Sequence, residues 1–440
     1  MKITPTTVLD FKQALREDLP VPKHLTILAL GSHGDVFPNV VLGAALQQAG
    51  FRVRLITFAN FGPLVNQFGL DFAPVPGNAE VLLASSGGLA LLESGQNILK
   101  QYRALRQTFW QVADGLTDLL SKPNIWQTDG ILNQLPASLY GRSLAERLQI
   151  PLINVAVIPM LRTRLFPMVA FPGWPAFLPG YNALTYLLAE QLVWSGFRQS
   201  VNRWRQEVLG LGKRPFLGAF SQLGHTPTLL GFSPHIVPRP SDWESTIQFT
   251  GYWLPDEPDW TPPNGLVRFL EDGPPPILVS FGSMAVRNPQ RLTALVLQAA
   301  QLTNQRLILQ SGWAGLGQQD LPPTVFALDY APYRWLFPRL AAVVHHGGSG
   351  TTGFGFWAGI PNILTPFLFD QFYWGERIQV LGVGPAPIPQ KKLTAEKLAV
   401  AMTTAVSDQS MRQKAAALGE KIRQEDGLAT AVAAIQQLLC

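Results

Sequence analysis

The sequence predicts an α/β protein made of two doubly wound, Rossmann-like domains that face a shared cleft. Three observations support this fold class. The chain has 440 residues, which is too long for one hydrophobic core. In both halves, short apolar runs of strand length alternate with helical segments, which is typical of parallel sheets. A proline-rich segment separates the two series.

The first series begins with a strand, a turn and a helix. Residues 25–30 (LTILAL) form a buried-strand run that ends in the turn Gly31–Asp35. A helix is expected from about Asn39 to Ala49, and Gly50 would end it before the next strand at 51–58. Further strands are expected near Ile131 and at 151–158, so this domain extends over 24–240.

The second series follows ten prolines between Pro234 and Pro276, which make 241–275 the best linker candidate. It occupies residues 276–440 as a second domain with terminal helices over 394–439. Its expected strands are 277–281, 306–310, 325–328, 341–345 and 361–364, with a helix at 290–301.

Composition points to an apolar partner and a reducing compartment. The chain is 47% hydrophobic and 14% charged, and its one cysteine, Cys440, excludes an internal disulfide and a cysteine-based metal site. Residues 1–23 lack the apolar core of a signal peptide. The uncharged segment 165–189 is long enough to span a membrane, but its four prolines and two glycines favour a loop leading into a helix from about Tyr181. We expect a cytoplasmic protein without a transmembrane segment.

The net charge of +5 concentrates in one region. Residues 151–214 contain seven basic and two acidic residues among many aromatic ones. No nucleic-acid motif accompanies them, so a nucleic-acid partner is not expected. Peripheral contact with an anionic membrane fits the pattern, and a solvated basic face over an aromatic core fits it equally well. The basic residues are Arg162, Arg164, Arg198, Arg203, Arg205, Lys213 and Arg214.

A glycine-rich turn marks an anion site in the second domain. Residues 341–352 read AAVVHHGGSGTT, a buried strand that ends in two histidines and leads into a helix. Glycines let backbone N–H groups approach a phosphate, and a helix N-terminus favours negative charge. His345 would add a donor, whereas His346 alternates to the other face and would pack. Asp370 and Gln371 follow, a pair suited to sugar hydroxyls, so the ligand predicted is a nucleotide sugar.

Four stretches give the chain a resemblance to a known family. They read GSHGDVFP at 31–38, VSFGSM at 279–284, WLFP at 335–338 leading into VVHHGGSGTT, and PFLFDQFYWG at 366–375. The sequence resembles nucleotide-sugar glycosyltransferases of the two-Rossmann (GT-B) class, specifically the sterol 3β-glucosyltransferase-like group. The resemblance spans about 24–430 and is weakest over 76–240, where that family binds its acceptor.

The resemblance implies roles for individual residues. Asp35 occupies the place of the family's base, but His33 stands where these branches usually have arginine, so the base is either Asp35 or His33. The donor sugar would contact Asp370 and Gln371. Tyr330 would stack on the nucleobase. Further donor contacts implied are Ser32, Gly34, Ser283, His345, Gly347, Gly348, Ser349, Gly350 and Thr351, and the acceptor-pocket candidates are Phe166, Phe171 and Trp174.

The activity implied is inverting transfer of a sugar, glucose from UDP-glucose, to the hydroxyl of an apolar acceptor such as a sterol, terpenoid or other lipid alcohol. No Asp-x-Asp motif occurs, so we expect a metal-independent reaction with no cofactor beyond the UDP-sugar co-substrate. Two alternatives stay open. One is an NAD-type oxidoreductase, although neither turn carries Gly-x-Gly-x-x-Gly. The other is a non-catalytic nucleotide- or lipid-binding protein of the same fold.

Overall fold

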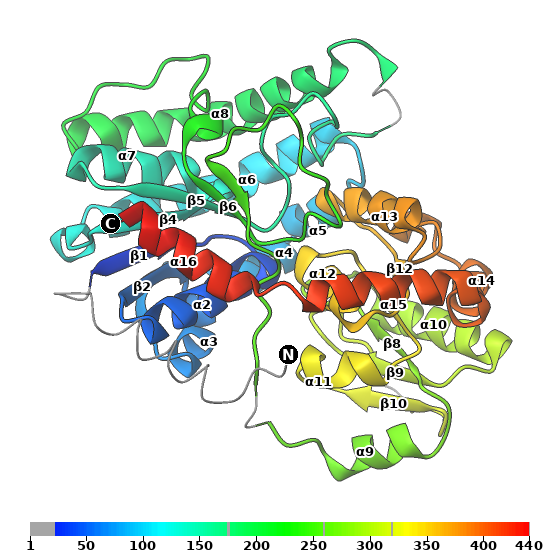
Figure 1. Ribbon diagram of the computed structural model, residues 1–440. Helices are drawn as coiled ribbons and strands as arrows, with labels where there is room; N and C mark the ends of the chain where they lie inside the picture. The colour runs from blue at the N-terminus through cyan, green and yellow to red at the C-terminus, as the bar shows by residue number, and fades with distance from the viewer. Residues whose placement is uncertain (1–22, 174–176, 258–259, 318–319, 440) are drawn as a thin grey trace.

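The computed structural model describes residues 23–173, 177–257, 260–317 and 320–439, and Trp174 and Cys440 lie outside these ranges. Within the described residues, two parallel sheets lie side by side, each flanked by helices (Figure 1). This arrangement confirms the predicted fold class of two doubly wound α/β domains.

The first sheet has seven strands among the described residues, in the order β3-β2-β1-β4-β5-β6-β7, and every pair is parallel. Its strands are β1 His24–Leu28, β2 Arg52–Phe58, β3 Asp71–Val75, β4 Gly130–Gln134, β5 Leu152–Ala156, β6 Thr228–Leu230 and β7 Ile247–Phe249. Its helices are α2 His33–Gln48, α3 Gly62–Gln67, α4 Ala79–Ala84, α5 Ser86–Leu92, α6 Ile98–Leu120, α7 Ser138–Leu148 and α8 Tyr181–Glu207.

The second sheet has five strands in the described part of the chain, in the order β10-β9-β8-β11-β12, again all parallel. Its strands are β8 Ile277–Ser280, β9 Leu307–Gln310, β10 Val325–Leu328, β11 Ala342–His345 and β12 Asn362–Leu364. The remaining helices are α9 Asn264–Glu271, α10 Pro289–Thr303, α11 Tyr333–Leu336, α12 Ser349–Ala358, α13 Asp370–Leu381, α14 Ala395–Ser407, α15 Gln409–Arg423 and α16 Gly427–Leu439.

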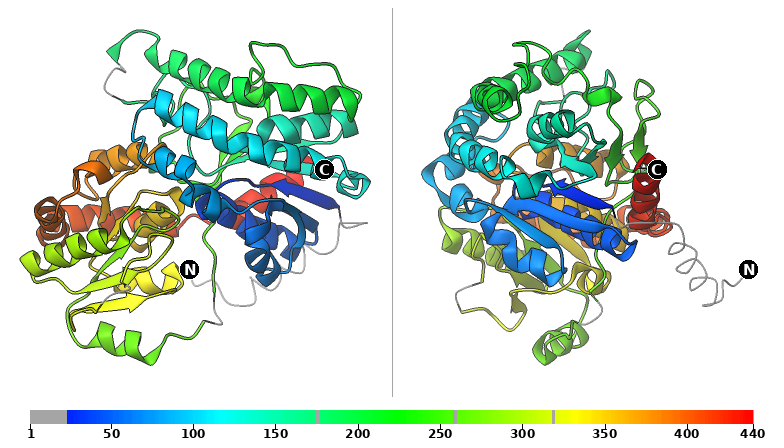
Figure 2. Two further views of the ribbon diagram at one scale, coloured as in Figure 1. Left: turned by 180° about the vertical axis from the view of Figure 1, so that it is seen from behind. Right: turned by 90° about the vertical axis from the view of Figure 1, so that its left-hand side faces the viewer.

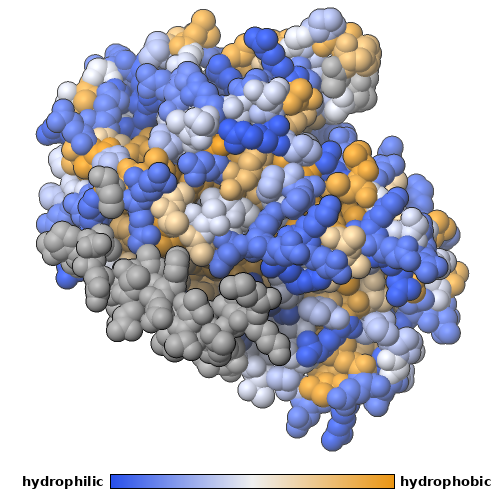
Figure 3. Space-filling view, in the orientation of Figure 1, coloured by the Kyte–Doolittle hydropathy of each residue, from blue (hydrophilic) through white to orange (hydrophobic). Residues whose placement is uncertain are grey.

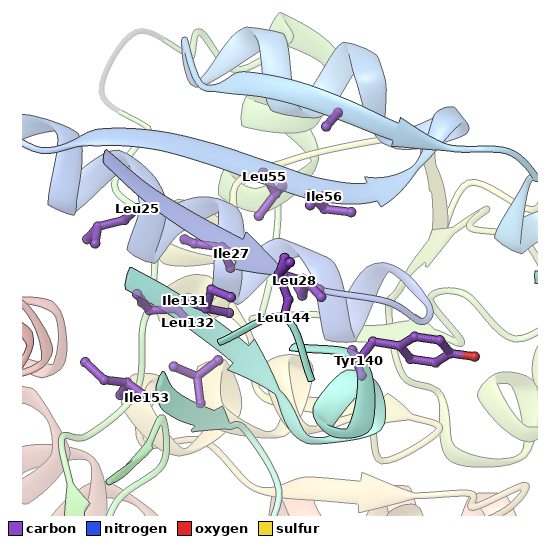
Figure 4. Close-up of a cluster of buried hydrophobic side chains, with 14 of the residues drawn as sticks. Leu25, Ile27, Leu28, Leu55, Ile56, Ile131, Leu132, Tyr140, Leu144 and Ile153 are labelled. Carbon is purple, nitrogen blue, oxygen red and sulfur yellow. The ribbon is translucent and has the colours of Figure 1, made fainter. Parts of the chain in front are cut away.

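The strands are covered on both faces, which explains why their sequences are continuous apolar runs. Helices α2 and α16 lie on one face of the first sheet, and α6 and α7 lie on the other with α8 packed outside them (Figure 2). Leu25, Ile27 and Leu28 of β1 are fully buried. They pack with β2, β4 and α7 in the cluster of Figure 4.

Helix α2 begins at His33, earlier than the predicted Asn39. The Asp35 carboxylate accepts a hydrogen bond from the N-cap Ser32 N–H at 2.8 Å, which is half of a capping box. This bond satisfies an N–H that the turn would otherwise leave without a partner. The turn Gly31–Asp35 is therefore largely the start of the helix.

The expected boundary at 240 does not match the strands. β7 lies inside the predicted linker 241–275 and completes the first sheet beside β6. The chain also returns, because α16 crosses back from the second domain and packs on the first (Figure 1). Ala431 and Ile435 are fully buried in the first domain's core. We therefore assign 24–249 and 427–439 to the first domain.

The strand order reverses at one place in each sheet. This switch point lies between β1 and β4 in the first sheet and between β8 and β11 in the second. Crevices at the carboxyl ends of strands at such points bind ligands in doubly wound folds. β1 leads into α2 and β11 leads into α12, so the two switch points deliver the two predicted turns.

Close packing between α12 and β12 gives a stability prediction. A Cβ atom at Gly355 would lie 2.0 Å from Asn362 Oδ1, whereas one at Gly196 in α8 would meet nothing within 4 Å. We expect Gly355→Ala to lower the free energy of unfolding by ~1–3 kcal/mol through overpacking. Gly196→Ala should raise it by ~0.5–1 kcal/mol through helix propensity. Guanidinium denaturation measures both, and a stabilising Gly355→Ala would contradict the packing described.

Candidate active site

The two switch points face each other across contacts between the domains. The Ser349 hydroxyl at the start of α12 donates to the Val157 carbonyl, 2.6 Å away, just after β5. Arg377 of α13 donates through Nε to the Ile236 carbonyl at 2.9 Å. These bonds hold the N-terminal end of α12 and the C-terminal half of α13 against the first domain.

Asp35 lies at this junction with both carboxylate oxygens hydrogen-bonded. Oδ2 accepts from the Ser32 N–H at 2.8 Å and from the Ser32 hydroxyl at 3.1 Å, and Oδ1 accepts from Gln134 Nε2 at 3.0 Å. Burial raises the pKa of Asp35, and the bonds from Ser32 and Gln134 oppose that rise. The N–H and the hydroxyl of Ser32, a residue predicted to contact the donor, both donate to Asp35. Gly34 forms part of the same helical turn.

His33 is adjacent in sequence but does not hold Asp35. Its ring stacks at a tilt on Phe37, with 5.0 Å between centroids, and lies 6.4 Å from Phe61. The surrounding protein desolvates the ring and so lowers the pKa of His33, although the residue as a whole is exposed. Among the described residues, the partners that orient the Asp35 carboxylate are Ser32 and Gln134. Sequence reasoning missed Gln134, although its place at the end of β4, beside β1, is a signal for it.

The two histidines after β11 exchange their predicted roles. His345 is fully buried. Its Nε2 lies 3.1 Å from Asn362 Oδ1 and its Nδ1 accepts the Gly347 N–H at 3.1 Å, so neither nitrogen is free for a phosphate. Burial, reinforced by His346, lowers the pKa of His345 to about 3. The expectation that His345 binds phosphate does not fit this geometry, because both ring nitrogens already stabilise the turn.

His346 is the better candidate for a phosphate contact. Its ring fits between two glycines: a Cβ atom would lie 3.0 Å from the ring at Gly282 and 2.4 Å from Nε2 at Gly348. Gly282 follows β8, so the ring sits between the ends of β8 and β11, at the switch point. Its Nδ1 has no partner among the described residues. Burial lowers the pKa of His346 to about 4, which leaves a neutral ring.

The glycine-rich turn supplies backbone donors at the start of α12. Gly347 has φ +97°, and a Cβ there would lie 2.9 Å from Leu364, so only glycine fits. Gly348 is the N-cap, and a Cβ at Gly350 would meet nothing within 4 Å. The first-turn N–H groups of Gly350 and Thr351 have no acceptor within the helix. The Ser349 side chain, by contrast, is taken by the bond to Val157.

Asp370 begins α13 and is electrostatically coupled to Asp35. Its Oδ2 accepts a hydrogen bond from Trp374 Nε1 at 2.9 Å. Burial, and then the charge of Asp35, raise the pKa of Asp370 to about 7. The effect of the Asp35 charge indicates that the two carboxyl groups lie near each other across the contact between the domains. The predicted contact of Asp370 with the donor sugar stays a prediction.

Gln371, its predicted partner, faces away from the ligand position. Its Oε1 accepts from the Phe367 N–H at 2.7 Å and the Leu368 N–H at 3.3 Å, and its Nε2 lies 3.3 Å from the Met284 sulfur. The side chain is 5% exposed. Oε1 therefore supports the turn before Asp370, and Nε2 is turned toward Met284 after β8; the predicted contact of Gln371 with the sugar stays a prediction.

Two further donor candidates lie at the ends of the second domain's strands. Ser283 follows β8 and is buried beside the switch point. Tyr330 follows β10 and is half exposed, and its hydroxyl donates to the Glu257 carboxylate. An exposed ring at a strand end is free to stack on a base, so Tyr330 stays a candidate for that role.

An apolar pocket of about 640 Å³ opens beside the cleft. One of the three predicted acceptor residues, Phe171, lines it, whereas Phe166 packs on Trp243 and Tyr373 elsewhere. The pocket reaches Phe369, the neighbour of Asp370. Its other walls include Met168, Leu192, Val193 and Phe197, the last three from α8. A bulky apolar molecule in this pocket would approach the two carboxyl groups.

The described residues offer no candidate for two other features, a metal site and a membrane-spanning helix. Within these ranges, no group of three or more His, Cys, Asp or Glu side chains could hold a metal ion. None of the helices described is long and apolar enough to cross a membrane.

Two family models match the chain. Residues 25–167 match the glycosyltransferase family 28 N-terminal domain, and residues 295–435 match the erythromycin biosynthesis protein CIII-like C-terminal domain. The first model falls on the first domain, and the second falls on the second domain and continues into α16, which packs on the first.

Relatives in sequence are sterol 3-beta-glucosyltransferases. That of Emericella nidulans is 37% identical over 446 residues, which covers 98% of this chain and 30% of the relative. That of Cryptococcus neoformans var. neoformans serotype D is 34% identical and the alignment covers 98% and 28%. The chain thus spans about 30% of the length of these relatives.

Solved structures with the same fold are glycosyltransferases. The kitacinnamycin glycosyltransferase has a TM-score of 0.70 at 20% identity, covering 96% of this chain and 100% of its own. A Streptomyces sp. SF2575 glycosyltransferase complexed with thymidine diphosphate has a TM-score of 0.62 at 21% identity, covering 94% and 99%. Facing switch points on two doubly wound domains define the GT-B class. The chain has the GT-B fold, its two halves match glycosyltransferase domain models, and its sequence is similar to the sterol 3-beta-glucosyltransferases.

The exchange of histidine roles gives a binding prediction. His346→Ala should weaken UDP binding ~10- to 100-fold, the cost of losing a hydrogen bond to a charged group, with little change in thermal stability. His345→Ala should lower the melting temperature, because it leaves Asn362 and Gly347 without partners in the core. Calorimetric titration with UDP and thermal unfolding measure the two effects. Unchanged UDP affinity in folded His346→Ala would rule out this contact.

Proposed function

We propose that the protein transfers glucose from UDP-glucose to the hydroxyl of a sterol, with inversion at the sugar. The main support is the position of Asp35. Its carboxylate lies at the first domain's switch point, electrostatically coupled to Asp370 across the cleft and beside an apolar cavity. The names of the relatives at 34–37% identity support the sterol acceptor and the glucosyl group.

The chemistry follows from the two faces of the cleft. Asp35 takes the proton of the acceptor hydroxyl as the oxygen attacks the anomeric carbon. The bond from that carbon to the diphosphate breaks, and its electron pair leaves with UDP. The free N–H groups at the start of α12, with His346, stabilise the charge that develops on the diphosphate. Asp370 hydrogen-bonds the sugar hydroxyls.

The base lies on one side of the anomeric carbon and the diphosphate-binding groups lie on the other, which implies in-line displacement. The diphosphate is bound by backbone N–H dipoles and a neutral histidine, and no step of this scheme requires a metal ion. We infer that UDP-glucose is a co-substrate and that the protein uses no further cofactor. Addition of a chelator should leave transfer unchanged.

The role of Asp35 is tested by replacing it with the isosteric amide. Asp35→Asn should reduce transfer to a sterol ~10²–10⁴-fold because it cannot accept the proton, with UDP-glucose affinity nearly unchanged. In the wild type, the acid limb of kcat/KM should lie above pH 3.8, since the pKa of Asp35 is raised and only its ionised form is active. Glucosylated sterol is measured by mass spectrometry over a pH series.

The alternative base is tested by the control variant His33→Gln. It should retain most of the transfer activity and the same acid limb. Full activity in Asp35→Asn, with loss in His33→Gln, would transfer the catalytic role to the histidine.

We further propose that the protein docks peripherally on anionic membranes through the outer side of α8. Large apolar side chains are exposed on this helix and on the loop before it. They gather beside the N-terminal end of α8 at the upper right of Figure 3. The residues are Leu165, Phe177, Leu178, Leu184, Leu187 and Leu188, each between 46% and 74% exposed. The same helix lines the apolar pocket, so a lipid alcohol has a short path from a bilayer to the site.

The structure changes which basic residues can serve this surface. Arg205 is buried and pairs with Glu146 through two bonds of 2.8 and 2.9 Å, and Arg214 joins the same carboxylate at 3.1 Å. Arg162 pairs with Glu190. These three hold the fold together and are not available to lipids. The remaining basic residues of the region are exposed, namely Arg164, Arg198, Arg203 and Lys213.

Docking is tested by making the exposed leucines polar. A triple variant, Leu184→Gln with Leu187→Gln and Leu188→Gln, should bind anionic liposomes several-fold more weakly while retaining transfer to detergent-solubilised sterol. Each exposed arginine contributes about 1 kcal/mol near an anionic surface, so wild-type binding should also fall with salt. The matched control is Val400→Gln, an exposed apolar residue on α14. Wild-type protein that ignores anionic liposomes at low salt would refute docking.

A further inference from the structure

Gln134 ends β4, the strand beside β1 at the switch point. The register pairs Leu28 of β1 with Asn133 of β4, so the carboxyl ends of both strands lie at the same level. The Gln134 side chain is 3% exposed, and its Nε2 donates to Asp35 Oδ1 at 3.0 Å. The buried amide of Gln134 can therefore orient the carboxylate of Asp35, the proposed base.

The two oxygens of Asp35 have different surroundings. Oδ2 accepts both bonds from Ser32, and a Cβ at Gly31 would lie 2.3 Å from it, so this oxygen is enclosed by the turn. Oδ1 accepts one bond, from Gln134. A cavity of about 210 Å³ lies beside them, lined by Asp35, Gln134 and the segment 155–158. The oxygen with spare hydrogen-bonding capacity is therefore the one on the Gln134 side.

We propose that Gln134 is a positioning residue for the transfer reaction: it fixes the Asp35 carboxylate so that Oδ1 faces the acceptor hydroxyl and receives its proton. This inference rests on the proposed function. Because Gln134 donates to the charged carboxylate, it also favours the ionised, proton-accepting form of Asp35. Ser32 alone would hold Oδ2 and leave the carboxyl group free to turn about that bond.

The other end of the amide supports this role. Gln134 Oε1 is buried and has no hydrogen-bond partner among the described residues. The bond to Asp35 is the one hydrogen bond of this side chain found in the described part of the chain. Once Oδ1 carries the proton, rotation of the amide brings Oε1 to it as an acceptor. A glutamine thus matches both protonation states of Asp35, which a lysine would not do, because its ammonium group has no acceptor.

The test replaces the amide with an apolar side chain of the same length. In Gln134→Met, kcat for sterol glucosylation should fall about 10-fold, in keeping with one lost hydrogen bond to a charged group, with UDP affinity unchanged. The acid limb of the pH profile should move to higher pH, because desolvation of Asp35 is then opposed by fewer donors. A loss of activity without a shift of the limb would refute the positioning role.

A second measurement does not depend on transfer. The Asp35 carboxyl carbon, labelled with ¹³C and assigned by its absence in Asp35→Asn, is titrated by NMR in the wild type and in Gln134→Met. A higher midpoint in the variant supports the proposal, and equal midpoints overturn it. Wild-type protein that glucosylates no sterol would refute the proposed function, while this titration would still decide the role of Gln134.

The matched control is Thr26→Val. Thr26 lies on neighbouring β1, is fully buried, and its hydroxyl also has no partner among the described residues. Its replacement is expected to change neither the pH profile nor the Asp35 midpoint. If Gln134→Met does not fold, Gln134→Asn keeps the amide but shortens it by one methylene, and the same shift is expected.

Discussion

The electrostatic interaction between two partly buried carboxyl groups, Asp35 and Asp370, is the constraint on which the rest of the site depends. Burial raises the pKa of both Asp35 and Asp370, and the charge of Asp35 adds to the rise at Asp370, whose pKa reaches about 7. Asp35 receives three hydrogen bonds from Ser32 and Gln134, whereas Asp370 receives one side-chain bond, from Trp374. Unequal support favours the ionised form of Asp35 over that of Asp370, whose pKa of about 7 leaves it partly protonated at neutral pH. The partly protonated group can donate to a sugar hydroxyl as well as accept.

Both carboxyl groups lie in the first turn of a helix, so the backbone before each helix must adopt a particular conformation. Asp35 follows the N-cap of α2, and Asp370 follows Phe369, whose φ of +48° and ψ of −130° are costly for a residue with a side chain. Gln371 accepts two N–H groups from the preceding turn and so offsets that cost. Phe369 in turn presents its ring to the apolar pocket. The strained residue is thus what joins the donor-sugar position to the acceptor wall.

The sequence predicted the five described strands of the second sheet, β1, β2, β4 and β5 of the first, and the glycine-rich turn, because these depend on local chemistry: apolar runs and glycine at φ +97°. It missed β3, β6 and β7. The sequence could not show which of His345 and His346 keeps a ring nitrogen without a protein partner, since strand alternation separates two faces without showing which one lies at the cleft. The bond of the Ser349 hydroxyl to Val157 was beyond sequence reasoning for a similar reason, because the two residues are 192 positions apart. Gln134 was within reach of sequence reasoning: a polar residue that ends a buried strand next to the first one lies at the switch point.

Helix α8 connects the site to the surface, and its anchoring explains how one helix serves both. Arg205 and Arg214 clamp its C-terminal half to Glu146 of α7, with Arg205 buried against Ser143. Toward the pocket, the helix presents Leu192, Val193 and Phe197, and outward it exposes Leu184, Leu187 and Leu188. A helix fixed at one end by a buried ion pair can bear apolar side chains on two sides without collapsing onto the domain. Arg205 and Arg214 therefore act as structural anchors, and the proposed contact with lipid is left to the leucines and to the exposed cations Arg164, Arg198, Arg203 and Lys213.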